Sequence, residues 1–98
     1  MAHKIEHFID GKRMEPSGNT LCNDVNPATG EVLAEVSLDA GEVDVAVASA
    51  SRAFSGWSET PIGERCQVLF RFKTLLEQHF DELTQLIVNE HGKTTAEA

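Results

Sequence analysis

Between residues 62 and 91 the chain carries a regular repeat of hydrophobic positions. These positions follow one another in steps of three and four, as on one face of a helix: Ile62, Cys66, Leu69, Phe72, Leu76, Phe80, Leu83 and Ile87. Three further apolar residues widen this stripe beyond the narrow seam of a coiled coil: Leu75, Leu86 and Val88. The pattern predicts a core helix of a globular protein, with a partner packed against the stripe.

The same run is too long for one straight helix in so small a protein. About thirty residues of helix would extend about 45 Å, so we expect a break near residues 78–80. The entry at Pro61 fits the first helical position, and Gly92 has the character of a C-terminal cap. Two helices are therefore predicted, over about residues 61–78 and 80–91.

A second amphipathic repeat precedes that run. Asp39 and Glu42 have the spacing of a capping box and would place two acidic groups at the positive end of a helix. The predicted helix covers about residues 40–55, and residues 56–59 would connect it to the next helix. Its apolar stripe is spaced four, three, four and three: Val43, Val47, Ala50, Phe54 and Trp57.

Short strands are predicted in the first 37 residues. Asp10-Gly11 between two short runs indicates a hairpin, because both turn positions need a positive φ. We therefore predict strands at about residues 5–9 and 12–15, and two more at Leu21–Val25 and Glu31–Ser37. The Asn-Pro-Ala-Thr-Gly tract between the last two strands has the composition of a turn.

These elements give an α+β fold in one unit, residues 1–98, with β-hairpins and strands within about residues 5–37 followed by two to three amphipathic helices. Thr94 and Glu97 have the spacing of a further capping box, which predicts the opening of another helix near Ala98. We therefore expect the chain to be the truncated N-terminal segment of a longer protein.

Composition and charge narrow the classes of partner. Sixteen acidic residues against eight Lys and Arg give a formal net charge of −8, and the basic residues form no patch, so nucleic acid is not an expected partner. No apolar run approaches the roughly 20 residues of a membrane span, and the first residues lack the apolar core of a signal peptide. We expect a cytoplasmic protein with no membrane partner.

The candidate reactive residues lack the neighbours that their chemistry requires. Cys66 lies on the apolar stripe and Cys22 in a strand without a basic neighbour, so both are expected to remain unreactive thiols. The glycines fit neither the dinucleotide nor the phosphate-loop fingerprint. The histidines lack the spacing of metal ligands: His3, His7, His79 and His91. We expect no catalytic, cofactor-binding or metal-binding residue in this chain.

Five short motifs follow one another over nearly the whole chain: Phe8-Ile9-Asp10-Gly11-Lys12, Asn26 to Val32, Ala50 to Trp57, Arg65 with Leu69, and Asn89 to Thr94. In their order and spacing they resemble the N-terminal part of the NAD-dependent aldehyde dehydrogenases, so the fold would be part of that family's fold. The opening His-Phe-Ile-Asp-Gly-Lys and the tract His-Gly-Lys-Thr are most similar to the CoA-acylating methylmalonate-semialdehyde dehydrogenase branch.

The resemblance implies a parent enzyme with a dinucleotide-binding domain, a catalytic domain and a β-arm that joins subunits. Its chemistry is attack of a cysteine thiolate on an aldehyde, hydride transfer to NAD, and release of the acyl group to coenzyme A or water. In the branch named, methylmalonate or malonate semialdehyde yields propionyl-CoA or acetyl-CoA. The nucleophile, the base and the NAD-binding turn of the family would lie beyond Ala98, so NAD and coenzyme A are implied for the full-length family and this chain is expected to be inert.

Two interpretations remain open: a truncated dehydrogenase, or a free-standing helical module that associates with itself or another protein. In both, we expect a homodimer or a higher homo-oligomer formed through the helix faces. Each large apolar side chain left exposed on the stripes would forgo about 1.5–3 kcal/mol of burial.

Overall fold

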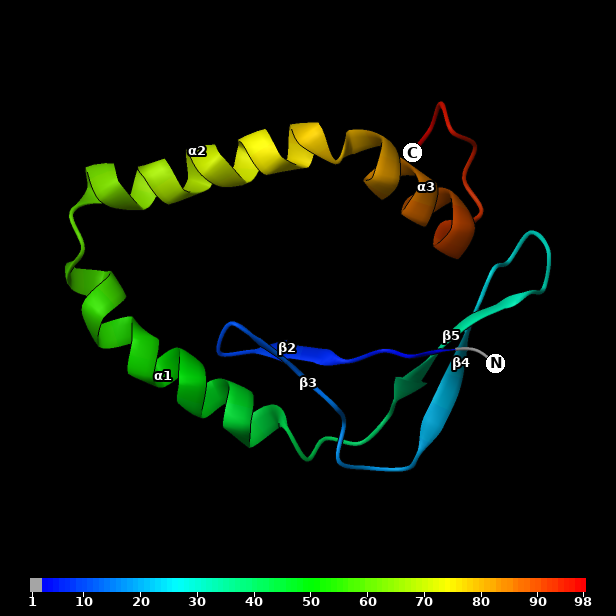
Figure 1. The fold of residues 1–98 in the computed structure, drawn as a ribbon, viewed down its shortest axis with the longest axis horizontal. Coiled ribbons are helices and arrows are strands. Elements are labelled where there is room, and N and C mark those ends of the chain that lie inside the picture. Colours follow the sequence, from blue (N-terminus) through cyan, green and yellow to red (C-terminus); the bar gives the residue numbers. More distant parts are fainter. Residues whose placement is uncertain (1–2) are drawn as a thin grey trace.

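Five short strands and three helices form a flat ring that is one layer of secondary structure thick (Figure 1). The computed structural model describes residues 3–98, with extents of 48 × 36 × 16 Å. The strands occupy one side of the ring, and the three helices form an arc that leaves the strands and returns to them. The α+β class and the order of elements predicted from the sequence are confirmed.

Two small sheets form the β part. Strands β1 (His3–Lys4), β5 (Val32–Ser37) and β4 (Leu21–Val25) make one sheet in that order, with β1 parallel and β4 antiparallel to β5. Strands β2 (His7–Ile9) and β3 (Lys12–Met14) form the predicted hairpin. Both turn residues have positive φ, 55° at Asp10 and 70° at Gly11, as the sequence requires.

Of the strand predicted over residues 5–9, only His7–Ile9 forms as β2, and a separate strand in the other sheet, β1, precedes the predicted range. The backbone amide of Ile5 donates to the carbonyl of Glu35 at 2.8 Å, which extends the β1–β5 pairing. Two residues later His7 pairs with Met14 in the hairpin. The chain therefore changes partners at residues 5–6, and the parallel β1–β5 pairing has no local signal because it joins segments far apart in sequence.

The turn between β4 and β5 is built on the side chain of Asn26. Its Oδ1 accepts the backbone amides of Ala28 at 2.9 Å and Thr29 at 3.3 Å, and its carbonyl accepts the amide of Gly30 at 2.8 Å. Gly30 has φ 78°, which an L-residue rarely adopts. The predicted turn is confirmed.

The helices are α1 (Val43–Glu59), α2 (Ile62–Gln78) and α3 (Phe80–His91). The break predicted near residues 78–80 lies at His79, whose φ of −103° and ψ of 20° interrupt the helix. The predicted cap is also present, since Gly92 has φ 76° and donates its amide to the carbonyl of Val88. In the described part of the chain no helix is both long and apolar enough to cross a membrane.

Helix α1 differs from its prediction at both ends. It starts at Val43 rather than near residue 40, and it continues through residues 56–59, which were predicted as a connection. Gly56 does not end the helix, because a glycine lowers helix propensity without forbidding the helix. Nothing lies within 4 Å of a Cβ added at this position. The helix ends instead where Thr60 becomes extended, with ψ 131°, ahead of Pro61.

The capping box predicted at the start of α1 is wrong. Glu42 occupies the N-cap position but makes no side-chain capping bond. Its Oε1 accepts the backbone amide of Ser17 at 2.7 Å, and Asp39 Oδ2 accepts that of Thr20 at 3.0 Å. Both carboxylates therefore tie the start of the helix to the segment that precedes β4.

The capping signal near the C-terminal end is partly realised. Glu97 Oε2 accepts the backbone amide of Thr94 at 3.3 Å and its hydroxyl at 3.0 Å. The amides of Glu97 and Ala98 both donate to the carbonyl of Thr94, at 3.1 and 3.0 Å. A helical turn opens there, but the threonine hydroxyl binds the carboxylate rather than a backbone amide.

The long apolar stripe predicted to be core is exposed in this ring. Leu69 is 62% and Phe80 64% exposed, whereas Ala34, in β5, is 2% exposed. The accessible surface is 7740 Å², against about 5,500 Å² for a compact protein of this mass. The physical reason is thickness: a single layer offers α1 and α2 no second layer on which to pack.

Replacing Gly92 with alanine should lower the free energy of unfolding by about 1–3 kcal/mol. A Cβ at this left-handed position would lie 3.0 Å from Pro27 Cγ in the turn after β4. Gly56→Ala, in open space inside α1, is the matched control and should stabilise by about 0.5–1 kcal/mol. Urea unfolding followed by circular dichroism measures both, and equal responses of the two variants would contradict the cap and contact assigned to Gly92.

Candidate functional site

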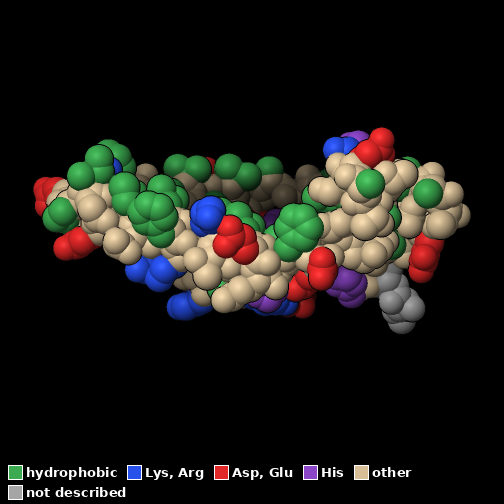
Figure 2. All heavy atoms as spheres, turned by 90° about the horizontal axis from the view of Figure 1, so that it is seen from above, with side chains coloured by type: hydrophobic (Ala, Val, Ile, Leu, Met, Phe, Trp, Pro, Cys, Tyr) green, Lys and Arg blue, Asp and Glu red, His purple; other side chains and the backbone are tan. Residues whose placement is uncertain are grey.

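The most extensive feature of the molecule is an apolar surface carried by α1 and α2. On α1 the predicted stripe is open to solvent along its length, and Phe54 is 69% exposed. Seen edge-on, hydrophobic side chains gather on one flat side of the helical part, toward the upper edge of Figure 2. Several Lys, Arg and His side chains lie along the opposite edge, and others lie on the rim and at the upper right of the view. Hydrophobic side chains are thus more frequent on one flat side of the helical part.

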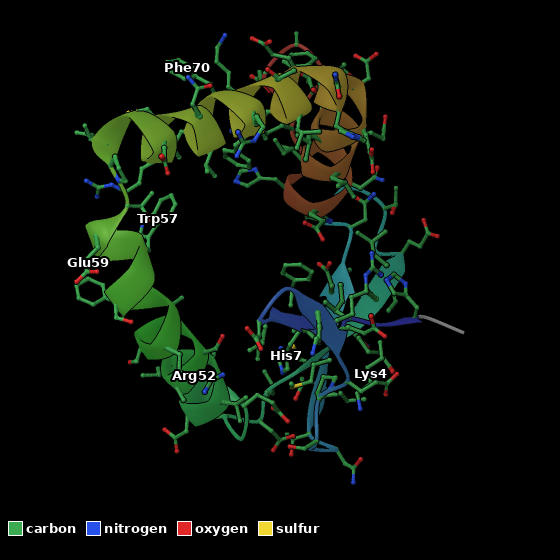
Figure 3. All side chains as sticks on the ribbon, turned by 60° about the vertical axis from the view of Figure 1, so that its left-hand side comes forward. Lys4, His7, Arg52, Trp57, Glu59 and Phe70 are labelled. Carbon is green, nitrogen blue, oxygen red and sulfur yellow. The ribbon has the colours of Figure 1, made fainter. Side chains whose placement is uncertain are left out.

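The apolar residues of α2 spread around more than half of its circumference, with Arg65, Lys73 and Glu77 among them. At 3.6 residues per turn, Leu69 and Phe72 lie on one side of the helix and Phe70 nearly opposite Phe72. Figure 3 shows Phe70 on the outer rim of the ring, away from its opening, whereas Trp57 lies near the junction of α1 and α2. A helix with so wide an apolar arc is typical of one that packs on more than one neighbour.

One buried carboxylate positions this surface relative to the strands. Glu42 is 8% exposed, accepts the Ser17 amide through Oε1, and places Oε2 at 3.4 Å from His7 Nε2, an ion-pair distance rather than a hydrogen bond. Figure 3 shows His7 on the hairpin beside this junction. Glu42 thus joins three segments: the hairpin, the segment before β4 and the start of α1.

The environment of Glu42 favours its charged form. Hydrogen bonds from Ser17, first from the hydroxyl and then from the backbone amide, lower the pKa of Glu42, and the nearby His7 adds to this effect. Burial acts in the opposite direction but is the smaller influence. The junction therefore depends on an ionised carboxylate.

The ring closes where α3 meets the turn after β4. Asp24 raises the pKa of Glu90, first through hydrogen bonding between the two carboxyl groups and then through their charge repulsion. Gly92 lies against Pro27 at the same place. Sequence analysis could not find these contacts, because the paired residues belong to elements separated by the whole helical arc.

Two open surface cavities lie along the hairpin. One of about 500 Å³ includes Lys4 and Arg13 in its lining, but Lys4 Nζ donates to the carbonyl of Gly18 at 3.4 Å, and Arg13 lies 3.8 Å from Glu6. The other, of about 220 Å³, lies between the hairpin and α1 beside Glu42. Lys4 thus makes a long hydrogen bond to the backbone, and Arg13 takes part in an exposed ion pair.

The residues considered as candidates for chemistry lie far apart in the fold. Cys22 is exposed on β4, and Cys66 on α2 is half-buried, so the full burial implied by its place on the stripe is not observed. His79, at the break between α2 and α3, places its Nδ1 2.8 Å from Glu82 Oε2 in α3. Within residues 3–98 no three His, Cys, Asp or Glu side chains converge as metal ligands.

Residues 14–98 match the sequence profile described as the aldehyde dehydrogenase family. The chain belongs to the aldehyde dehydrogenase family. Malonate-semialdehyde dehydrogenase 1 of Geobacillus kaustophilus (strain HTA426) is 42% identical over 95 residues, which cover 96% of this chain. The malonate-semialdehyde dehydrogenase of Bacillus subtilis (strain 168) is 41% identical over 96 residues, which cover 97% of it.

A solved structure has the same arrangement of elements. It is a putative methylmalonate-semialdehyde dehydrogenase from Sinorhizobium meliloti 1021 complexed with NAD, and it aligns with 99% of this chain at a TM-score of 0.84 and 36% sequence identity. The aldehyde dehydrogenase chain described here spans 20% of the length of that protein and of the Geobacillus relative. The resemblance read from the sequence is confirmed.

The contribution of Glu42 to stability should depend on pH. Because its pKa is lowered on folding, ionised Glu42 stabilises the fold above the ordinary value of 4.5, and this contribution should be lost as pH falls through the lower, folded value. Thermal unfolding of wild type and Glu42→Gln between pH 3 and 7 measures the difference. It should be largest near neutral pH and shrink on acidification; parallel curves at every pH would contradict this role.

Proposed function

We propose that this chain is the N-terminal part of an NAD-dependent dehydrogenase that oxidises malonate or methylmalonate semialdehyde and transfers the acyl group to coenzyme A. The observation that carries the proposal is the match over 99% of the chain to a structure named for this activity and complexed with NAD. The relatives named malonate-semialdehyde dehydrogenase, at 41–42% identity, support the same substrate class. The acylating step rests on the similarity of the His-Gly-Lys-Thr tract to that branch.

Within such an enzyme the chain acts as scaffold. Its apolar helix faces provide a surface on which the dinucleotide-binding and catalytic layers of a longer polypeptide pack. The flat ring supplies one layer, and domains of this size are built from at least two. The wide apolar arc of α2 fits a helix covered from more than one side.

The 98 residues alone contribute no catalytic group in this proposal. A nucleophilic cysteine needs an adjacent base or a helix N-terminus to form its thiolate. Cys22 lies on an exposed strand and Cys66 on the apolar stripe of α2, and no base is shown beside either thiol.

We expect no NAD reduction by the purified 98-residue chain with malonate or methylmalonate semialdehyde, with or without coenzyme A. Absorbance of the reduced cofactor at high protein concentration measures this directly. Turnover that is abolished by alkylating the two cysteines would contradict the scaffold role and place the chemistry in this chain.

A chimera tests the positive half of the proposal. This chain replaces the matching 20% of the Geobacillus malonate-semialdehyde dehydrogenase, and the product is assayed for coenzyme A-dependent NAD reduction. The chimera should be active, and Phe54→Asp within it should reduce the yield of active enzyme, since it places a charge on a covered face. Phe8→Asp, on the hairpin, is the matched control. A folded but inactive chimera would count against the substrate assignment.

A further inference from the structure

We propose that protons act in opposite directions on the two contacts that attach the helical arc to the strands. Acidification strengthens the contact at the end of α3, where Glu90 meets Asp24 of β4, and weakens the contact at the start of α1. The second contact joins Glu42 to Ser17 and to His7 of the hairpin. The proposal does not depend on the dehydrogenase assignment.

Both contacts lie within the chain and need no further polypeptide. Figure 1 shows that the helical arc leaves the strands at the start of α1 and returns to them at the end of α3. The solved structure of the longer relative has the same arrangement, with a TM-score of 0.84 over 99% of this chain. Loss of either contact would therefore free one end of the arc.

Two carboxyl groups meet where α3 returns to the strands. Glu90 lies in the last turn of α3, and Asp24 lies in β4. Gly92, just beyond the helix, lies against Pro27 at the same place. Two ionised carboxylates in hydrogen-bonding range repel one another, whereas a proton on one of them converts the repulsion into a hydrogen bond. A proton should therefore tighten this end of the arc.

The sign of this effect follows from the environment of Glu90. Hydrogen bonding with Asp24 raises the pKa of Glu90, and charge repulsion from Asp24 and burial act in the same direction. The stabilising contribution is fully present below the ordinary value of 4.5 and is lost as pH rises through the raised value. The other charged groups at this end are Glu31 in the turn, and His91 and Lys93, which follow Glu90 along the chain.

The contact at the start of α1 has the opposite dependence. Glu42 Oε1 accepts the Ser17 amide at 2.7 Å, and Oε2 lies 3.4 Å from His7 Nε2. Asp39 and Lys4, the other charged groups at this junction, each bind the backbone of the segment before β4. Hydrogen bonds from Ser17 lower the pKa of Glu42, so this contact weakens only as pH falls below 4.5 through the lowered value.

The two titrations are therefore ordered in pH. As pH falls from neutral, Glu90 gains its proton above 4.5 and Glu42 gains its proton below 4.5. Between these two events the arc is attached at both ends. Near neutral pH the end of α3 has to overcome the repulsion between two carboxylates, and in stronger acid the start of α1 loses its carboxylate. The combined contribution of the two contacts to stability should be greatest near pH 4.5.

Nuclear magnetic resonance between pH 3 and 7 reports both contacts in the unmodified chain. The side-chain carboxyl carbon of Glu90 should titrate above 4.5, coupled to that of Asp24. The amide proton of Ser17, which donates to Glu42, should shift only below 4.5. Asp24→Asn should return the titration of Glu90 to the ordinary range and leave the Ser17 shift unchanged.

Substitutions measure the effect of each contact on stability. Glu90→Gln removes the repulsion and keeps a hydrogen-bond donor for Asp24, so near neutral pH it should raise the unfolding temperature above that of wild type. The gain should shrink on acidification and, because salt screens exposed charges, also at high ionic strength. Glu31→Gln is the matched control for the loss of one negative charge and should change the unfolding temperature little at either pH. The effects of Glu90→Gln and Glu42→Gln should add in the double variant, since the sites lie at opposite ends of the arc.

A Glu90 carboxyl that titrates at its ordinary value in wild type, with no response to Asp24→Asn, would overturn the proposal. A Glu90→Gln variant that unfolds below wild type near neutral pH, or that behaves as Glu31→Gln does, would overturn it as well. If a variant fails to fold, the titration of Glu90 in the unmodified chain still decides the matter. None of these readouts depends on the activity of the chimera, so the proposal and the dehydrogenase assignment can fail separately.

Discussion

A layer of secondary structure can bury an apolar helix face only against another layer, and this chain supplies one. The exposure of the helix faces follows from that constraint. Leu69 and Phe54 are exposed although their spacing is that of core residues, and the accessible surface exceeds that of a compact protein of equal mass. The helices therefore carry apolar faces that can be buried only against further polypeptide, whether a longer chain or a second copy.

Local signals in the sequence predicted most of the elements. Asp10-Gly11 required a hairpin because both residues take positive φ, and Gly92 ended α3 for the same conformational reason. The break at His79 followed from helix length rather than from any breaker residue. The sequence could not predict the β1–β5 pairing or the contact of Glu90 with Asp24, since each depends on segments that meet only in the folded ring.

The start of α1 shows how tertiary contacts can override a local motif. Asp39 and Glu42 had the spacing of a capping box, but both accept backbone amides from the segment before β4. A carboxylate near the start of a helix can accept backbone amides of that helix or of a distant segment, and sequence spacing alone does not distinguish these two cases. The same limit holds for the candidate site. Periodicity predicted the apolar stripes of the helices, but it could not predict that the Glu42 carboxylate positions α1 relative to the strands.

The closure between Gly92 and Pro27 has a consequence for how the ring assembles. The hairpin and each helix form from residues close in sequence, so they can order on the microsecond scale or faster. Joining α3 to the turn after β4 brings together segments separated by two helices and β5, and loop-closure entropy opposes it until those elements exist. Closure should accordingly be the last step of folding and the first to reverse, so that the contact between Gly92 and Pro27 opens before the middle of α2 unfolds.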